Sequence, residues 1–112
     1  MTQSYLRFLN LVQAIRGLPS VPVLDPVEER LLNALAALWA NGEPVTVLQA
    51  MNCEPDTSPS TVHRRLKSLR KLGLITYVEK ADDQRSKYVE LTPRAKQYYA
   101  ALSRCMEKAT GR

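Results

Sequence analysis

The chain has 112 residues, of which 45% are apolar and 24% charged, and its formal net charge at pH 7 is +5. These totals are typical of one small domain, so we expect residues 1–112 to fold as a single unit. A run of about 18 apolar residues that could cross a membrane is missing, and polar residues interrupt the first twenty where a signal peptide would be apolar. We therefore expect a cytoplasmic protein.

The chain has one histidine and two cysteines that are far apart. Zinc sites need four clustered ligands, so we expect no metal. The only candidate for a general base, His63, is followed by two arginines, which suit phosphates better than proton transfer, and no glycine-rich phosphate loop is present. We expect neither an enzyme nor a bound cofactor.

The first two predicted elements are helices separated by prolines. Apolar residues at helical spacing predict a helix over residues 3–17, with a stripe of Tyr5, Phe8, Leu9, Val12 and Ile15. Pro19, Pro22 and Pro26 then interrupt helix formation. Asp25 and Glu28 have the spacing of a capping box around Pro26, which predicts a second helix that ends at Asn41-Gly42.

Two more helices, a hairpin and a last helix follow. Thr46 and Gln49 repeat the capping-box spacing and predict a short third helix. Ser58-Pro59 opens a fourth helix over residues 59–72, and β-forming residues at 74–79 and 87–91 flank a polar turn, or wing, at 80–86. Thr92-Pro93 begins a helix over 93–109. The order α-α-α-α-β-β-α is mainly α with a small β-hairpin, which is the winged helix-turn-helix class of fold.

Positive charge is concentrated in one segment. Residues 57–96 contain ten Lys and Arg against four Asp and Glu, whereas residues 1–56 contain three against six. A local basic excess is the electrostatic signature of a surface that binds a polyanion such as nucleic acid. Charge alone would also fit a solvated face.

The fourth helix has an apolar side and a basic side. At 100° per residue, the apolar residues Val62, Leu66 and Leu69 fall within about 60° of one another. The opposite side carries Ser60, Arg64, Lys67 and Lys71, flanked by Thr61, His63 and Ser68. No acidic residue occurs between Thr57 and Ile75, although solvated helices usually interleave acids with bases. This pattern favours a DNA-recognition helix over a solvated face.

Position along this helix suggests a role for each polar residue. The first turns of a recognition helix enter the major groove, so Ser60, Thr61 and Arg64 are the candidates for reading bases. Arginine can form a two-pronged contact with guanine. His63 could contact a base or a phosphate, or contact neither. Phosphate contacts, which add affinity without sequence information, are expected from Lys67, Ser68, Lys71, Lys87, Thr46 and Gln49.

The segment Asp83-Gln84-Arg85-Ser86, followed after four residues by Leu91-Thr92, resembles the D-x-R-[ST]-x-x-x-x-L-T signature of MarR-family transcriptional regulators. Residues 58–66 and 69–75 resemble the recognition helix of that family and its exit. The resemblance implies a bacterial winged-helix regulator whose wing arginine, here Arg85, enters the minor groove, with Asp83 orienting it or a neighbouring base. A narrow minor groove attracts an inserted guanidinium. Alternatively, Asp83 and Arg85 pair with each other in solvent.

The family also implies a homodimer joined through helices 3–17 and 93–109, on a palindromic operator. The stripe of the first helix, with Tyr98, Tyr99, Leu102 and Met106 of the last, could form that joint or pack within one subunit. Because the chain is shorter than is usual in the family, we expect abbreviated terminal helices. A small-molecule effector and a redox role for Cys53 stay open, with no pattern in their favour.

The sequence thus predicts a sequence-specific regulator, in particular a dimeric repressor, that binds double-stranded DNA. Two alternatives use the same fold. One is a winged-helix interaction or assembly module that does not read bases, and the other is a nonspecific DNA binder. Fold alone does not separate these functions.

Overall fold

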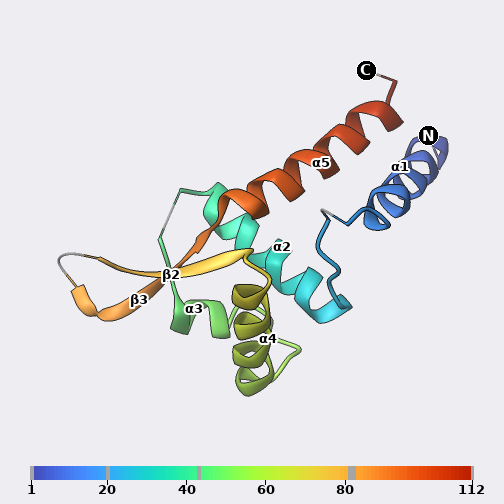
Figure 1. Ribbon diagram of the computed structural model, residues 1–112. Coiled ribbons are helices and arrows are strands. Elements are labelled where there is room, and N and C mark those ends of the chain that lie inside the picture. Colours follow the sequence, from blue (N-terminus) through green and yellow to red (C-terminus); the bar gives the residue numbers. More distant parts are fainter. Residues whose placement is uncertain (1, 20, 43, 81–82, 112) are drawn as a thin grey trace. The chain divides into compact units, whose positions relative to one another are not determined.

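A computed structural model of the chain describes residues 2–19, 21–42, 44–80 and 83–111, and within these it leaves the side chains of residues 80 and 83–86 undescribed. In chain order the elements are α1 (Thr2–Arg16), α2 (Pro26–Ala40), β1 (Val45–Thr46), α3 (Val47–Met51), α4 (Pro59–Lys71), β2 (Ile75–Lys80), β3 (Asp83–Leu91) and α5 (Pro93–Ala109) (Figure 1). They form two compact units, one of residues 1–23 and 95–112 and one of residues 24–94. None of the described helices is long and apolar enough to span a membrane.

The predicted helix boundaries are confirmed to within one residue where a cap marks them. The Asp25 carboxylate accepts a hydrogen bond from the Glu28 backbone N–H at 2.7 Å, and the Glu28 carboxylate accepts one from the Asp25 N–H at 3.0 Å. This reciprocal pair satisfies two N–H groups that would otherwise lack a partner at the start of α2. The helix ends at Ala40, with Asn41 as its C-cap and Gly42 at a φ of +79°.

One strand was missed by the sequence analysis. β1 pairs antiparallel with β3, placing Val45 opposite Val89 and Thr46 opposite Tyr88. The sheet therefore has three strands in the order β1-β3-β2, and the observed element order is α-α-β-α-α-β-β-α. A two-residue strand shows no periodicity of its own, because it is defined only by a partner that lies more than forty residues away.

The predicted turn at 80–86 also needs correction. The backbone of residues 83–86 belongs to β3, and Lys80 pairs with Asp83 after an irregularity between Glu79 and Lys80. Polar side chains suggested a turn, but strands accept them wherever both faces of a hairpin meet solvent. The β2–β3 hairpin extends away from the helices of its own unit (Figure 1). Residues 81 and 82 lie outside the described residues.

The core of the 24–94 unit forms where apolar side chains of α2 and α4 pack together with those of the sheet. Its largest fully buried side chains come from α2, α4, the connection between α4 and β2, and β3, and are Leu31, Leu32, Leu35, Val62, Leu66, Leu69, Leu74 and Val89. The Trp39 indole N–H donates to the Val89 carbonyl at 2.9 Å and so ties α2 to β3. These contacts fix α4 between the other two helices and the sheet.

Candidate nucleic-acid interface

The start of α4 is held by a serine cap. The Ser58 hydroxyl oxygen accepts a hydrogen bond from the Thr61 backbone N–H at 3.3 Å, and Pro59 occupies the first turn. Proline suits that position because it has no N–H that needs a partner there. The predicted opening of the helix at Ser58-Pro59 is therefore confirmed.

The end of α4 is a Schellman motif. Gly73 has a φ of +77°, its N–H donates to the Arg70 carbonyl at 3.0 Å, and the Leu74 N–H donates to the Leu69 carbonyl at 3.0 Å. Glycine adopts this left-handed conformation without the steric cost of a Cβ atom. The helix stops at Lys71, with Leu72 as its C-cap, so the predicted range 59–72 is one residue too long.

Two residues beyond the hairpin return to this helix end. The Thr92 hydroxyl donates to the Gly73 carbonyl at 2.6 Å, and the Arg94 guanidinium donates to the Leu72 carbonyl at 2.6 Å. A cation beside the terminal carbonyls of a helix also complements its dipole. Sequence analysis assigned Arg94 no role, because its partner lies 22 residues earlier. The threonine of the Leu91-Thr92 pair thus helps to fix the exit of α4.

The inner side of α4 is apolar and fully buried, as predicted. Val62, Leu66 and Leu69 are at most 1% exposed. Arg65, at the edge of this side, forms an ion pair of 2.7 Å with Asp25, the residue that caps α2. Arg65 therefore braces α4 against the start of α2. This packing determines which face of α4 points outward.

The outward side of α4 is polar. Ser60, Arg64, Lys67 and Lys71 are exposed, whereas Thr61, His63 and Ser68 are half-buried at its margins. The structure thus brings all seven predicted residues of this helix to one side and its flanks. Within the described part of the chain, no carboxylate forms an ion pair with Arg64, Lys67 or Lys71. Their charges remain available to a polyanion.

Hydrogen bonds within α4 distinguish the hydroxyl groups. The Thr61 oxygen accepts from the Ser58 hydroxyl at 2.9 Å and from the Arg64 guanidinium at 3.5 Å, so its own hydrogen can still be donated. The Ser68 hydroxyl instead donates to the Arg64 backbone carbonyl at 3.3 Å. Ser68 would have to break that bond to donate to a phosphate, which makes it the weakest of the phosphate candidates on this helix.

The two candidates before α4 cap a helix of their own. The Thr46 oxygen accepts from the Gln49 N–H at 3.1 Å, and the Gln49 Oε1 accepts from the Thr46 N–H at 2.9 Å. This predicted capping box is confirmed. It uses the oxygen of Gln49 and leaves the amide Nε2 as a donor on an exposed side chain. The site therefore has a second row of donors, at the start of α3.

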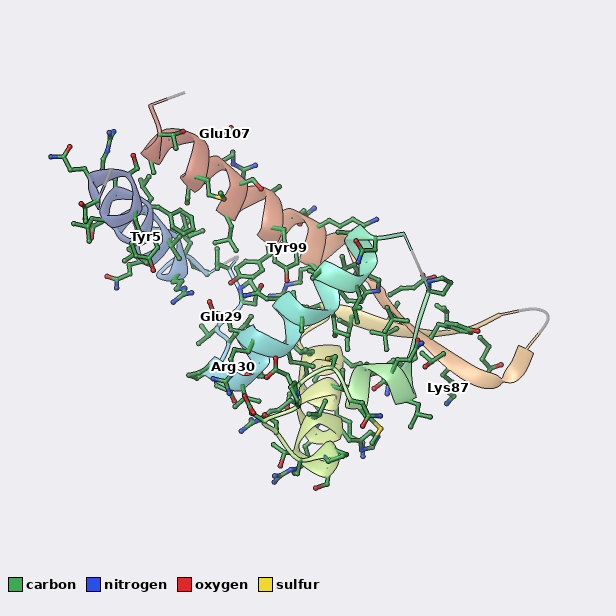
Figure 2. The ribbon with its side chains drawn as sticks, turned by 180° about the vertical axis from the view of Figure 1, so that it is seen from behind. Tyr5, Glu29, Arg30, Lys87, Tyr99 and Glu107 are labelled. Carbon is green, nitrogen blue, oxygen red and sulfur yellow. The ribbon has the colours of Figure 1, made fainter. Side chains whose placement is uncertain are left out.

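Of the candidate residues in the hairpin, Lys87 is the one whose side chain the structure describes. Lys87 is exposed on β3, opposite Glu79 of β2 (Figure 2). The backbone of Asp83 and Arg85 lies in β3, whereas their side chains lie outside the described residues. The geometry of the described site therefore comes from α4, the start of α3 and Lys87 of β3.

One cationic residue of α4, Arg70, was not among the predicted site residues. The Arg70 guanidinium lies 4.1 Å from the centroid of the Tyr77 ring, close enough for a cation–π interaction. Tyr77 was assigned only a strand-forming role, since nothing local in the sequence places it against Arg70. Burial raises the pKa of the Tyr77 phenol, and the positive charge of Arg70 partly opposes that shift. The ring is therefore neutral at pH 7.

Cys53 lies half-buried in the turn between α3 and α4. Burial raises the pKa of its thiol, and the neighbouring Glu54 carboxylate raises it further. Desolvation is the larger of these two causes. Reactive thiols need a lowered pKa. In the described part of the chain, no three His, Cys, Asp or Glu side chains are grouped as metal ligands.

Comparisons with known proteins give matches only among solved structures. A scan against protein-family models and a search of curated proteins give no match. A MepR mutant from S. aureus bound to an oligodeoxyribonucleotide is 19% identical, with a TM-score of 0.67 over 96% of this chain and 73% of that one. The transcriptional regulator Tm0710 from Thermotoga maritima is 14% identical, with a TM-score of 0.65 over 96% and 68%.

A third neighbour has higher sequence identity but lower structural similarity. It is a probable transcriptional regulator from Pseudomonas aeruginosa, which is 26% identical, with a TM-score of 0.53 over 98% of this chain and 79% of that one. Together these structures show that the chain has the winged helix-turn-helix fold of transcriptional regulators. The resemblance to MarR-type regulators is confirmed at the level of the fold.

Proposed function

We propose that this chain is a MarR-type transcriptional regulator that binds double-stranded DNA in a sequence-specific way. The outward side of α4 carries this proposal. It is polar, basic and free of acids, and it is held in place by caps at both ends and by a fully buried opposite side. Structural neighbours are transcriptional regulators, and one of them is bound to an oligodeoxyribonucleotide. A positioned basic helix on this fold fits the major groove.

Sequence preference would come from the first two turns of α4. Ser60, Thr61 and Arg64 would face base edges, with His63 beside them. A two-pronged contact from Arg64 to guanine would contribute about 1–3 kcal/mol of discrimination. Affinity without sequence preference would come from contacts to phosphates, which we assign to Lys67, Ser68, Lys71, Lys87, Thr46 and Gln49.

The wing would supply a second contact in the neighbouring minor groove. Arg85 would insert there, and Asp83 would orient it. In support, the backbone of both residues belongs to β3, which pairs antiparallel with β2 in a hairpin. Narrow minor grooves concentrate negative potential and favour an inserted arginine.

We further propose that the protein is a homodimer that represses transcription from a palindromic operator. Support comes from α1 and α5, the helices predicted to form the joint. On α1 the side chains of Tyr5, Leu6 and Leu9 are exposed, at 61%, 53% and 37%, and on α5 Met106 is 58% exposed. Apolar groups grouped on one helix are suited to an interface. Two-fold symmetry of the protein matches two half-sites of a palindrome.

Genomic-fragment selection followed by binding titrations at several salt concentrations tests the proposal. A specific regulator would select one inverted repeat and bind it at least about 10³-fold more tightly than random DNA. Equal affinity for all fragments would support the nonspecific binder instead. No binding at low salt would contradict both DNA-binding functions and favour an interaction module.

A further inference from the structure

A basic cavity opens at the C-terminal end of α4, next to the start of β2. It has a volume of about 440 Å³ and is lined by Lys67, Arg70, Lys71, Ile75 and Thr76. Three of these five residues are cations, and no carboxylate is among the described residues of the lining. A concave surface with one sign of charge concentrates the potential that attracts an anion.

Arg70 lines this cavity and also contacts the sheet. On the helical projection it lies about 80° from Val62, between the buried side and the outward side of α4. Its guanidinium stacks 4.1 Å from the centroid of Tyr77, which follows Thr76 on β2. In the described part of the chain no carboxylate forms an ion pair with Arg70, Lys67 or Lys71. The positive charge of the cavity is therefore not compensated from within the described unit.

Among the described residues, the Arg70 guanidinium contacts the Tyr77 ring and has no hydrogen-bond acceptor. A cation–π contact uses the flat face of the group, while its N–H donors point outward in its plane. The planar fork fits two phosphate oxygens at once. The Tyr77 hydroxyl is buried and has no hydrogen-bond partner among the described residues, so the ring contributes its face rather than its hydroxyl group. The contact with Tyr77 therefore restrains the Arg70 side chain beside the cavity that it lines.

We propose that this cavity binds one backbone phosphate of duplex DNA, with Arg70 as the principal ligand, Lys67 and Lys71 as flanking charges and Tyr77 as the positioning residue. The inference rests on the proposed function and extends it beyond the residues that the sequence identified. The bound strand would leave the outward side of α4 at its C-terminal end and pass over the first residues of β2.

A double-substitution cycle tests the contact. Duplexes carrying the selected site are made with one neutral methylphosphonate at a time, and binding is measured for the wild type, Arg70→Gln and Arg30→Gln. Arg30, an exposed residue of α2, is the matched control for the loss of one charge (Figure 2). At one position in each half-site, the methylphosphonate should lower the affinity of the wild type and of Arg30→Gln for the duplex by about tenfold. The same methylphosphonate should not lower the affinity of Arg70→Gln, which has already lost the contact. If no position shows this coupling, the inference is wrong.

Salt dependence and the Tyr77 variants provide a second readout. Loss of one phosphate contact should lower the slope of log K against log salt concentration by about 0.9 in Arg70→Gln. Tyr77→Leu, which removes the ring, should reduce the loss of affinity that the methylphosphonate causes. Tyr77→Phe, which keeps the ring, should show the full loss. If Tyr77→Phe and Tyr77→Leu reduce the methylphosphonate effect equally, the Tyr77 ring does not position Arg70.

The two levels of the proposal fail in distinguishable ways. If the wild type binds no duplex, the proposed function itself fails. If the wild type binds and Arg70→Gln has the affinity, salt slope and methylphosphonate profile of Arg30→Gln, the function stands and the phosphate cavity is refuted. Equal thermal unfolding midpoints of the three proteins would show that the comparison concerns binding rather than folding.

Discussion

The helices α4 and α1 are both amphipathic, and they meet solvent in opposite ways. α4 buries its whole apolar side and exposes cations, whereas α1 buries Val12 and leaves Tyr5, Leu6 and Leu9 exposed. The apolar side of α4 finds its packing partners within the chain, so only its exposed basic side is left to bind a partner, which must be anionic. An exposed apolar side lacks an apolar partner. The contrast explains why we assign DNA to α4 and a second copy of the chain to α1.

The largest expected effect comes from the buried side of α4. Leu66 is fully buried, so Leu66→Ala should lower the free energy of unfolding by roughly 2–5 kcal/mol through lost burial and a residual cavity. Leu48→Ala is the control, because Leu48 is 70% exposed on α3 and its truncation should change stability by less than about 0.5 kcal/mol. Urea denaturation measures both. Equal losses would mean that the core is not where the structure puts it.

The exposed side of α1 should respond through association rather than folding. Tyr5→Glu places a charge in the proposed interface and should weaken dimerisation at least tenfold, which corresponds to about 1.4 kcal/mol. Gln3→Glu, on another side of the same helix, should leave dimerisation unchanged. Sedimentation equilibrium measures the dimer dissociation constant. A Tyr5→Glu protein that dimerises like the wild type would remove α1 from the interface.

Substitution of Gly73 measures how much the left-handed backbone conformation at the end of α4 matters for stability. Its φ of +77° should make Gly73→Ala cost about 1–2 kcal/mol of stability, because a Cβ atom strains this backbone conformation. The added methyl group meets no obstacle, since Arg94 lies 3.8 Å from its position. Gly17→Ala has no such φ and should be neutral within a few tenths of a kcal/mol. Thermal unfolding of both variants separates backbone strain from a general effect of losing glycine.

The smallest expected effect concerns Cys53. Burial, and then Glu54, raise the pKa of its thiol, so the protonated form is favoured in the fold. The stability gained from the protonated Cys53 thiol is therefore complete below the ordinary thiol pKa. It declines as the pH rises through the raised pKa of Cys53 in the fold. In a Cys105→Ser background, iodoacetamide should modify Cys53 more slowly than free cysteine at pH 7.5. Faster modification would instead support a redox role.

Local chemistry explains which parts of this fold the sequence could predict. Asp25 acts with Glu28 and Thr46 with Gln49, each pair three residues apart, so their spacing alone predicted where two helices begin. The acid-free side of α4 follows from helical periodicity in the same way. These features required no knowledge of what packs against them.

The features that were missed depend on distant partners. β1 exists because Val45 meets Val89, Arg94 matters because it reaches the Leu72 carbonyl, and Arg70 gains its orientation from Tyr77. The length of the hairpin strands likewise depends on pairing between β2 and β3. Contacts of this kind are set by the packing of the whole unit, so no local pattern in the sequence predicts them.

The outward side of α4 is proposed to read DNA bases. The most direct test compares the affinities of Arg64→Ala and Lys71→Ala for the selected operator and for its single-base variants. Arg64→Ala should lose about 1–3 kcal/mol on the operator and relax the preference at one base pair in each half-site. Lys71→Ala should weaken all sequences alike and lower the salt slope. Equal losses for Arg64→Ala on every sequence would contradict base reading by α4.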